Sequence, residues 1–321
     1  MFEVVARTSQ IVKENKYKRL IVIVGPTAVG KTDIAIQLAD YLHTEIVSAD
    51  SRQIFKELNI GTAKPSSDEL TKVPHYFIGN RSIHEEYDAG QYGRDALELI
   101  HQLFQKHNQV ILCGGSGLYV KAVCEGFDDL PEVPEGIRAK IVDGYEQFGL
   151  EWLQKQLKEK DPDFFLVVDQ KNPHRLIRAL ELIETTQQPI GTLRKQKKLQ
   201  HDFEILKIGL ELNREQLYHR IDTRMDQMIE AGLFEEANSF YPLKELNALQ
   251  TVGYREIFDY LDGLYDKEEA VRLLKRNTRR YAKRQLTWFK KDDEVQWFHP
   301  SDFGKIKSYI SGSSLASIDG L

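Results

Sequence analysis

Short runs of consecutive apolar residues alternate with segments of helical periodicity over the first 125 residues. The run Leu20–Val24 is apolar, β-branched and stopped by Gly-Pro, as expected of a strand buried on both faces of a parallel sheet. The segments at 45–49 and 109–113 repeat this pattern, whereas 31–42 and 94–106 carry apolar residues at helical spacing. The alternation predicts a doubly wound α/β sheet.

The pattern changes after Phe127, where two prolines and several acids form a linker. Long helical stretches without strand character follow. Strand character returns at 203–212, helices are expected from 214 to 291, and a last short strand is expected at 295–298. We therefore expect a first part of the α/β core at 1–127, a helical insertion at 128–200, completion of the core with a helix-rich C-terminal part at 201–300, and a tail at 301–321 that is mobile from Ser311.

The composition is that of a globular protein, because 41% of the residues are apolar and 29% are charged. The net charge of −5 argues against a protein that coats nucleic acid non-specifically. However, the segment 272–291 holds nine Lys or Arg and no acid, which leaves 35 basic and 49 acidic residues elsewhere, a net charge of −14. This segregation indicates that one surface can meet an anionic partner.

The N-terminal segment lacks the apolar centre of a signal peptide, and no run approaches the ~18 apolar residues of a membrane-spanning helix. We expect a soluble, cytoplasmic protein. Cys113 and Cys124 are the only cysteines, and the sequence has no CxxC and no paired His, which disfavours a disulfide framework or a four-ligand zinc site. Both are interpreted as reduced structural thiols.

The most specific motif is GPTAVGKT, which follows the first strand and begins the first helix. Its glycines let the backbone surround a phosphate chain, and its amides with the positive helix end hold the anion. Lys31 adds a point charge, and the Thr32 hydroxyl is the predicted ligand of Mg²⁺. The predicted diphosphate-binding residues are Gly25, Pro26, Thr27, Ala28, Val29, Gly30, Lys31 and Thr32.

Two further strand ends refine this phosphate site. The strand at 110–113 runs into Gly-Gly-Ser-Gly rather than into the acid that ATP-hydrolysing P-loop proteins use to hold the metal. The acid follows the other strand instead, at Asp50, where a carboxylate can accept a proton from a nucleophile. A helix N-cap or a metal ligand is the alternative role for Asp50.

At this point the chain resembles the tRNA dimethylallyltransferases, also called tRNA isopentenyl transferases. The resemblance covers about 20–299, and the residues differ from the usual ones of the family at Phe55, Asn59 and Ser116. Without a C-terminal zinc finger, the sequence resembles the bacterial members. It rests on nine ordered motifs: GPTAVGKT, SADSRQIF, NIGTAKP, the Pro74-His75 pair, YDAGQYGRDA, GGSGLY, NPHRLIRALE, VGYRE and AKRQLTWF.

The resemblance implies transfer of a dimethylallyl group from dimethylallyl diphosphate to N6 of adenosine 37 in tRNAs that read codons beginning with U. The P-loop then binds a leaving group, with Mg²⁺ as cofactor, and Asp50 is the general base. The implied catalytic residues are Asp50, Ser116, Lys31, Arg220 and Arg224. A monomer that binds the tRNA anticodon arm and no membrane is expected.

The resemblance also implies a set of tRNA-binding residues, which includes the insertion. They are Asp50, Ser51, Arg52, Gln53, Ser116, Arg138, His174, Arg175, Leu176, Ile177, Arg178, Val252, Gly253, Tyr254, Arg255, Lys283, Arg284, Gln285 and Lys290. For Arg220 and Arg224, and for His174 and Arg175, a plain solvated helix face is the alternative.

At 100° per residue the basic segment predicts a helix with one packing face and one free basic face. The packing face is expected to hold Val271, Leu274, Tyr281, Trp288 and Phe289. The free face is expected to hold Arg272, Lys275, Arg276, Arg279, Lys283 and Lys290.

Other function classes remain open at this stage. One is a kinase using ATP at the same loop, or an isopentenyltransferase acting on free adenylate. Another is a P-loop protein that binds RNA without turnover. The helical insertion and the basic helix provide more surface than a free nucleotide requires.

Overall fold

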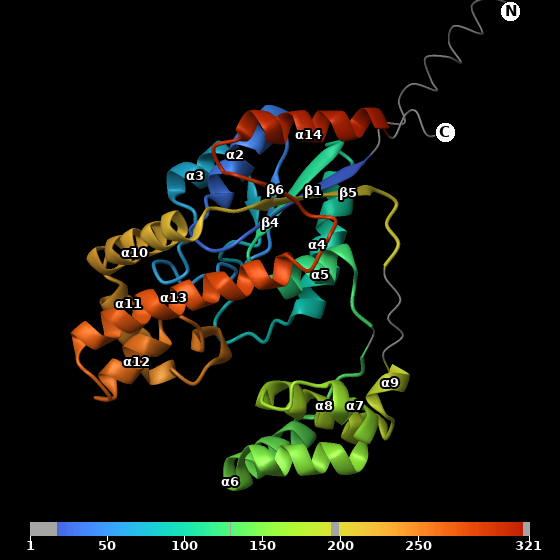
Figure 1. The fold of residues 1–321 in the computed structure, drawn as a ribbon, viewed down its shortest axis with the longest axis vertical. Helices are drawn as coiled ribbons and strands as arrows, with labels where there is room; N and C mark the ends of the chain where they lie inside the picture. Colours follow the sequence, from blue (N-terminus) through green and yellow to red (C-terminus); the bar gives the residue numbers. More distant parts are fainter. Residues whose placement is uncertain (1–17, 129, 194–198, 317–321) are drawn as a thin grey trace, which may run out of the picture. The chain divides into compact units, whose positions relative to one another are not determined.

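The computed structural model describes residues 18–128, 130–193 and 199–316, and these form two units (Figure 1). The core unit consists of Met1–Cys124 and Gln200–Leu321, and the insertion unit is Glu125–Leu199. The insertion unit thus begins three residues before, and ends one residue before, the expected insertion at 128–200.

The core unit contains a six-stranded sheet in which all neighbouring strands are parallel. The strand order is β3-β2-β4-β1-β5-β6, so β1 lies between β4 and β5. The α/β fold class expected from the sequence is confirmed. The strands are β1 (Arg19–Val24), β2 (Ile46–Ser48), β3 (His75–Tyr76), β4 (Gln109–Gly114), β5 (Glu204–Leu210) and β6 (Gln296–Phe298).

The apolar run of β1 forms a central strand because both of its faces are covered. Leu20, Val22 and Val24 belong to one buried cluster, while Ile21 and Ile23 belong to another. Helices α4 (Ala89–Leu103), α5 (Gly117–Cys124), α11 (Leu233–Phe240) and α12 (Arg255–Leu261) contribute to the first cluster. Helices α2 (Lys31–Leu42) and α10 (Arg214–Glu230) contribute to the second. The carboxyl ends of the strands remain available for a site.

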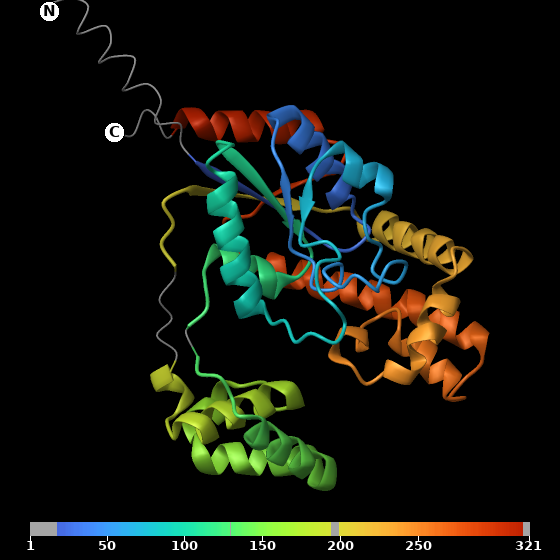
Figure 2. The same cartoon turned by 180° about the vertical axis from the view of Figure 1, so that it is seen from behind.

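The long helix α13 (Lys267–Phe289) begins at Asp266, whose side chain accepts a hydrogen bond from the amide of Glu269. Figure 2 shows α13 passing the carboxyl-terminal side of the sheet and continuing beside α12. The residues that it buries are Ala270, Leu274, Thr278, Ala282, Gln285 and Phe289. The short helix α3 (Ser67–Lys72) completes the core unit together with 3₁₀ turns at Tyr241–Leu243 and Asn247–Leu249.

The expectation of a tail from Ser311 is wrong for the described residues, because α14 (Phe303–Ala316) includes this segment. Ile306 and Ile310 are buried in the same cluster as α2. Figures 1 and 2 both show α14 beside α2, and Lys307 Nζ lies 5.0 Å from the ring centroid of Tyr41. Residues 317–321 lie outside the described part. No helix among the described residues is long and apolar enough to cross a membrane.

The insertion unit is helical, with no strand among its described residues. Its helices are α6 (Glu135–Lys160), α7 (Pro162–Val167), α8 (Pro173–Thr186) and α9 (Ile190–Leu193). A separate buried cluster includes Leu153 and Leu157 of α6 with Leu176 and Leu180 of α8. The helical register of α6 is interrupted at Gly149, whose φ is 74°. The unit therefore has its own core.

Candidate active site

The P-loop connects β1 to α2 in a conformation that depends on glycine. Gly30 has φ 103° and forms the N-cap of α2, where a left-handed backbone favours glycine. A Cβ atom on Gly25 would lie 2.6 Å from the carbonyl oxygen of Leu210, so the loop packs directly on the end of β5. Lys31 Nζ donates hydrogen bonds to the carbonyls of Gly25 (3.1 Å) and Pro26 (2.8 Å). The predicted phosphate-binding loop has the geometry expected of one.

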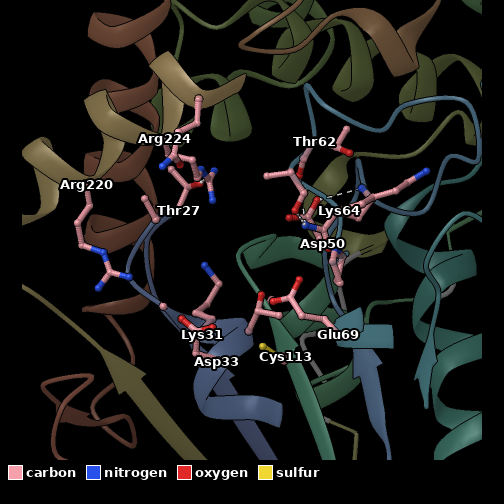
Figure 3. Close-up of a pocket in the computed structure, with 18 of the residues that line it drawn as sticks. Thr27, Lys31, Asp33, Asp50, Thr62, Lys64, Glu69, Cys113, Arg220 and Arg224 are labelled. Carbon is pink, nitrogen blue, oxygen red and sulfur yellow. Dashed lines mark hydrogen bonds between the residues drawn. The ribbon is translucent and has the colours of Figure 1, made fainter. Parts of the chain in front are cut away.

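A cavity of about 510 Å³ lies in front of this loop, at the carboxyl ends of β1, β2 and β4 (Figure 3). In Figure 3, Arg220 and Arg224 of α10 face it from one side, and Asp50 and Thr62 face it from the other. The walls are formed by Thr27, Ala28, Gly30, Lys31, Thr32, Asp33, Asp50, Gln53, Thr62, Ala63, Lys64, Pro65, Glu69, Cys113, Gly114, His219, Arg220, Thr223, Arg224 and Gln227.

Lys31, Arg220 and Arg224 line the P-loop side of this cavity, and none of them forms an ion pair with a carboxylate among the described residues. Burial lowers the pKa of Lys31 to about 8, although Cys113 and Asp50 oppose this effect. Burial likewise lowers the pKa of Arg224, whose Nη2 donates to Thr27 Oγ1 at 2.6 Å. Arg220 Nη1 donates to the carbonyl of Val29 at 3.3 Å. Lys31 and Arg224 are desolvated and Arg220 is exposed, and together these three cations without an ion-pair partner fit an anionic ligand with several oxygens.

Asp50 follows β2 and uses its two carboxylate oxygens differently. Oδ1 accepts hydrogen bonds from the backbone amides of Arg52 (2.9 Å) and Gln53 (3.3 Å). This is the capping alternative considered for Asp50, realised in a turn rather than in a helix. Within the described part of the chain, Oδ2 accepts no hydrogen bond. The backbone thus fixes one oxygen and leaves the other able to accept a proton.

The turn after β4 packs closely against its neighbours. A Cβ atom on Gly114 would lie 2.1 Å from the carbonyl oxygen of Ala49, which brings the ends of β2 and β4 together. The Ser116 hydroxyl accepts from the amide of Ser51 (2.8 Å) and donates to Ser51 Oγ (3.1 Å). Ser116 is not among the residues that line the cavity. In this structure Ser116 therefore supports the turn that carries Asp50.

Gln285 of α13 joins the P-loop to the turn after β4. Its Oε1 accepts from the amide of Thr27 at 2.8 Å, and its Nε2 donates to the carbonyl of Gly115 at 2.9 Å. Its side chain is buried. The resemblance implied a tRNA contact for Gln285, but its side chain points inwards in the structure.

The expectation that one face of α13 carries six free cations is largely wrong. Four of its six cations form ion pairs, with Glu269, Asp226, Asp222 and Glu211 as the partners of Arg272, Lys275, Arg279 and Lys290 respectively. A count of charges along one helix missed these acids because they lie outside 272–291. Asp222 and Asp226 belong to α10, Glu211 directly follows β5, and Glu269 precedes the segment by one helical turn. Trp288, expected to pack, is 39% exposed. The cations of the segment that have no acidic partner among the described residues are Arg276, Arg280, Lys283, Arg284 and Lys291.

The other predicted tRNA-binding residues of the core unit divide by exposure. Arg255 is exposed at the start of α12. Tyr254 is completely buried, and its hydroxyl donates to Glu236 Oε1 at 2.6 Å, so its side chain cannot meet tRNA in this structure. Val252 is half-buried, and Gly253 is buried. This motif therefore contains residues that pack in the core as well as an exposed residue, and the resemblance alone did not distinguish the two kinds.

The predicted residues of the insertion unit lie on or near α8. His174 and Arg175 are exposed, whereas Leu176 is buried in the core of the unit and Ile177 is half-buried. Arg138 and Arg178 both bind the carboxylate of Glu181, at 3.0 and 3.2 Å, and the Glu181 side chain is only 1% exposed. Both guanidinium groups are largely exposed. The leucine is a packing residue, and the two arginines share one buried acid.

Sequence reasoning missed two parts of the cavity wall. Thr62, Ala63 and Lys64 line it, and Gln53 Nε2 holds this loop by donating to the carbonyls of Thr62 (3.2 Å) and Ala63 (3.0 Å). On α10, His219 also lines the cavity, directly before Arg220. Thr223 and Gln227 line it as well, three and seven residues after Arg220. Helical spacing from Arg220 predicts the latter two. The loop had no comparable signal beyond its motif.

The fold and the cavity define a P-loop protein whose charged groups suit a phosphorylated ligand, and comparison with known proteins gives its family. The chain matches the IPP transferase family over residues 53–292. A tRNA dimethylallyltransferase of Cytophaga hutchinsonii is 52% identical over 296 residues, 92% of this chain and 97% of that protein. tRNA dimethylallyltransferase 1 of Bacteroides thetaiotaomicron is 47% identical over 302 residues, 94% of this chain and 98% of that protein.

A solved structure agrees with these sequences. The full-length tRNA isopentenylpyrophosphate transferase from Bacillus halodurans is 35% identical, with a TM-score of 0.70, and the match covers 95% of this chain and 100% of that one. The chain therefore belongs to the IPP transferase family. The resemblance inferred from the nine motifs is confirmed.

Proposed function

We propose that this protein transfers the dimethylallyl group of dimethylallyl diphosphate to N6 of adenosine 37 in tRNAs that read codons beginning with U, and releases diphosphate. The observation that carries the proposal is the arrangement of the cavity. Lys31, Arg220 and Arg224 face it from the P-loop and α10, and Asp50 faces it from the end of β2 (Figure 3).

The cationic side of the cavity suits a departing diphosphate. As the allylic C1–O bond breaks, positive charge develops on the five-carbon unit and negative charge develops on the diphosphate oxygens. Lys31 and the P-loop amides stabilise that anion, with Arg220 and Arg224 on its other side. No water has to be aimed at a phosphate, which agrees with a β4 that ends at Gly114 without an acid.

The opposite side of the cavity suits proton removal. The N6 amine of adenine attacks C1 and loses a proton, which Asp50 Oδ2 takes up. Because Oδ1 is held by the amides of Arg52 and Gln53, the carboxylate has a defined orientation before substrate arrives. The base must leave its stack to enter the cavity, and an unpaired loop base does so at lower cost than a paired one.

The donor groups fit Mg²⁺ carried mainly by the diphosphate. Thr32 offers a hydroxyl to the cavity, which Asp33 and Asp50 also line. No group of three or more His, Cys, Asp or Glu side chains in the described residues is arranged to hold a metal by itself. Mg²⁺ usually keeps several waters and binds few protein ligands together with substrate phosphates. We propose that Thr32 would hold the ion, which would neutralise charge on the leaving group.

One assay tests the proposal. The protein is incubated with unmodified tRNA and dimethylallyl diphosphate labelled in the five-carbon unit, without ATP. The expected result is label on N6 of adenosine 37. Absence of transfer together with ATP consumption on a small acceptor would replace the proposal with the kinase alternative, and transfer to free adenylate would move it to the free-nucleotide enzymes.

We also propose that the protein acts as a monomer in the cytoplasm, where its tRNA substrate is found. The segregated basic residues at the C-terminal end of α13, including Lys283 and Arg284, are exposed and suit the phosphates of an anticodon arm. Sedimentation with and without tRNA tests the stoichiometry, and a complex of one protein with one tRNA is expected.

A further inference from the structure

Gln285 connects three parts of the core unit that the reaction uses separately. Its Oε1 accepts from the Thr27 amide in the P-loop, and its Nε2 donates to the Gly115 carbonyl after β4. Thr27 in turn accepts, at Oγ1, a hydrogen bond from Arg224 of α10. A chain of contacts therefore runs from α13 through the P-loop to a cavity arginine.

The packing around Gln285 leaves little freedom. A Cβ atom on Gly115 would lie 2.3 Å from Gln285 Nε2, so the amide rests directly on the turn backbone. One helical turn further, a Cβ atom on Gly117 would lie 2.3 Å from Trp288 Nε1. Two successive turns of α13 are thus fitted to one glycine turn, and a shift of the helix moves Gly115 and Thr27 together.

The residues adjacent to Gln285 on α13 face the other way. Lys283 and Arg284 are exposed and have no acidic partner in the described part of the chain, and both are proposed tRNA contacts. The same turn of helix therefore presents cations outwards and an amide inwards. A ligand that fixes the outer side restricts the inner side, because both belong to one rigid helical turn.

We propose that Gln285 is a positioning residue that couples tRNA on the exposed basic side of α13 to the diphosphate in the cavity. The inference rests on the proposed function. Bound tRNA fixes α13, Gln285 then fixes the Thr27 amide and the Gly115 carbonyl, and Thr27 positions Arg224 for the diphosphate. The coupling is reciprocal, so a bound donor strengthens tRNA binding by the same factor.

The test measures the coupling factor itself. The affinity of dimethylallyl thiodiphosphate, which resists transfer, is measured with and without saturating unmodified tRNA, in the native protein and in Gln285→Met. We expect tRNA to raise donor affinity at least about fivefold in the native protein, the lower end of ordinary coupling, and less than about twofold in the variant. At saturating tRNA the variant raises KM for the donor more than it lowers kcat.

Two further variants make the test specific. Gln285→Glu keeps the acceptor for Thr27 but loses the donor to Gly115, and it is expected to reduce the coupling factor. Thr278→Val is the matched control, because Thr278 is also buried on α13 but its hydroxyl donates only to the Leu274 carbonyl of the same helix. It is expected to keep the native coupling factor.

A measurement on the native protein avoids the risk that a variant misfolds. tRNA alone is expected to slow amide hydrogen exchange in peptides that contain Gly25–Val29. A protein that transfers the dimethylallyl group, yet shows no change in exchange and no coupling in the binding assay, would overturn the role of Gln285 but leave the proposed function intact. A protein that transfers nothing to tRNA would instead overturn the proposed function.

Discussion

The cavity and the basic helix both concentrate positive charge, but they hold it in opposite ways. In the cavity, Lys31, Arg220 and Arg224 donate to backbone carbonyls or to a hydroxyl, and none of them forms an ion pair with an acid among the described residues. Four of the nine cations of 272–291 are instead paired with carboxylates, as Arg279 is with Asp222 at 2.7 Å. Position relative to acids on neighbouring elements, rather than charge along the sequence, decides which cations can bind an anion.

The largest expected effect separates two carboxylates of the cavity. Asp50→Asn keeps an oxygen for the amides of Arg52 and Gln53 but removes the base, so kcat is expected to fall by about 10²- to 10⁴-fold with tRNA binding unchanged. Glu69→Gln is the matched control, since Glu69 lines the cavity but its carboxylate caps α3 at the Ser66 amide (2.7 Å). Single-turnover transfer measures both. A large loss in Glu69→Gln alone would assign the base to that residue.

The next largest effect compares the loss of an arginine on α10 with the loss of an arginine on α13. Arg224→Gln removes an unpaired cation from the cavity, and kcat/KM for the donor is expected to fall by about 10- to 100-fold, the range of one charge-assisted hydrogen bond. Arg279→Gln removes a cation already paired with Asp222 and is expected to change kcat/KM less than threefold. Equal losses in the two variants would show that pairing does not distinguish these regions.

A smaller effect compares the two parts of α13 itself. Replacing Arg280 and Arg284 by Ala is expected to reduce the log–log salt slope of tRNA binding by about 1.5, because each phosphate contact contributes about 0.7 to 0.9. Replacing Arg272 and Lys275, which pair with Glu269 and Asp226, is expected to change the slope by less than about 0.5. Filter binding over a salt series measures both. A larger change in slope for the Arg272 and Lys275 variant would show that the basic face expected from helical spacing binds tRNA despite its ion pairs.

The smallest effect reverses the comparison. Asp222→Asn removes the acid that pairs with Arg279, and the freed guanidinium can then contact a phosphate. We expect tRNA affinity to rise by up to about fivefold, which corresponds to the free energy of one exposed ion pair. The free energy of unfolding is expected to fall by less than about 1 kcal/mol. Binding at low salt and urea unfolding test these values, and a weakened tRNA affinity would contradict the argument from pairing.

Local pattern predicted the sheet because its strands are apolar on both faces. Leu20–Val24 reads as a buried strand without any tertiary information, and five of the six strands were expected close to their observed bounds. The two-residue strand β3 (His75–Tyr76) is too short to carry a periodic signal. Helix α14 was missed because its small, polar residues after Ser311 resemble a tail, and only Ile306 and Ile310 anchor it.

The site was predictable where a motif requires a particular backbone, and less so where residues meet across the fold. The P-loop and the cavity-facing position of Asp50 follow from strand ends. The inward direction of Gln285 depends on contacts with Thr27 and Gly115, which lie 258 and 170 residues away in the sequence. The burial of Tyr254 against Glu236 depends on a similar tertiary contact.

The hydrogen bonds of Lys31 to Gly25 and Pro26 have a consequence for selectivity. A phosphate oxygen that takes this ammonium group must replace two bonds that the loop already makes with it. The loop therefore competes with its own ligand, and the competition has the same strength for every anion. A single phosphate or sulfate can offset this loss only at Lys31, whereas an anion long enough to reach Arg220 and Arg224 gains further charge-assisted hydrogen bonds. The loop is therefore expected to favour an extended polyphosphate over a small anion.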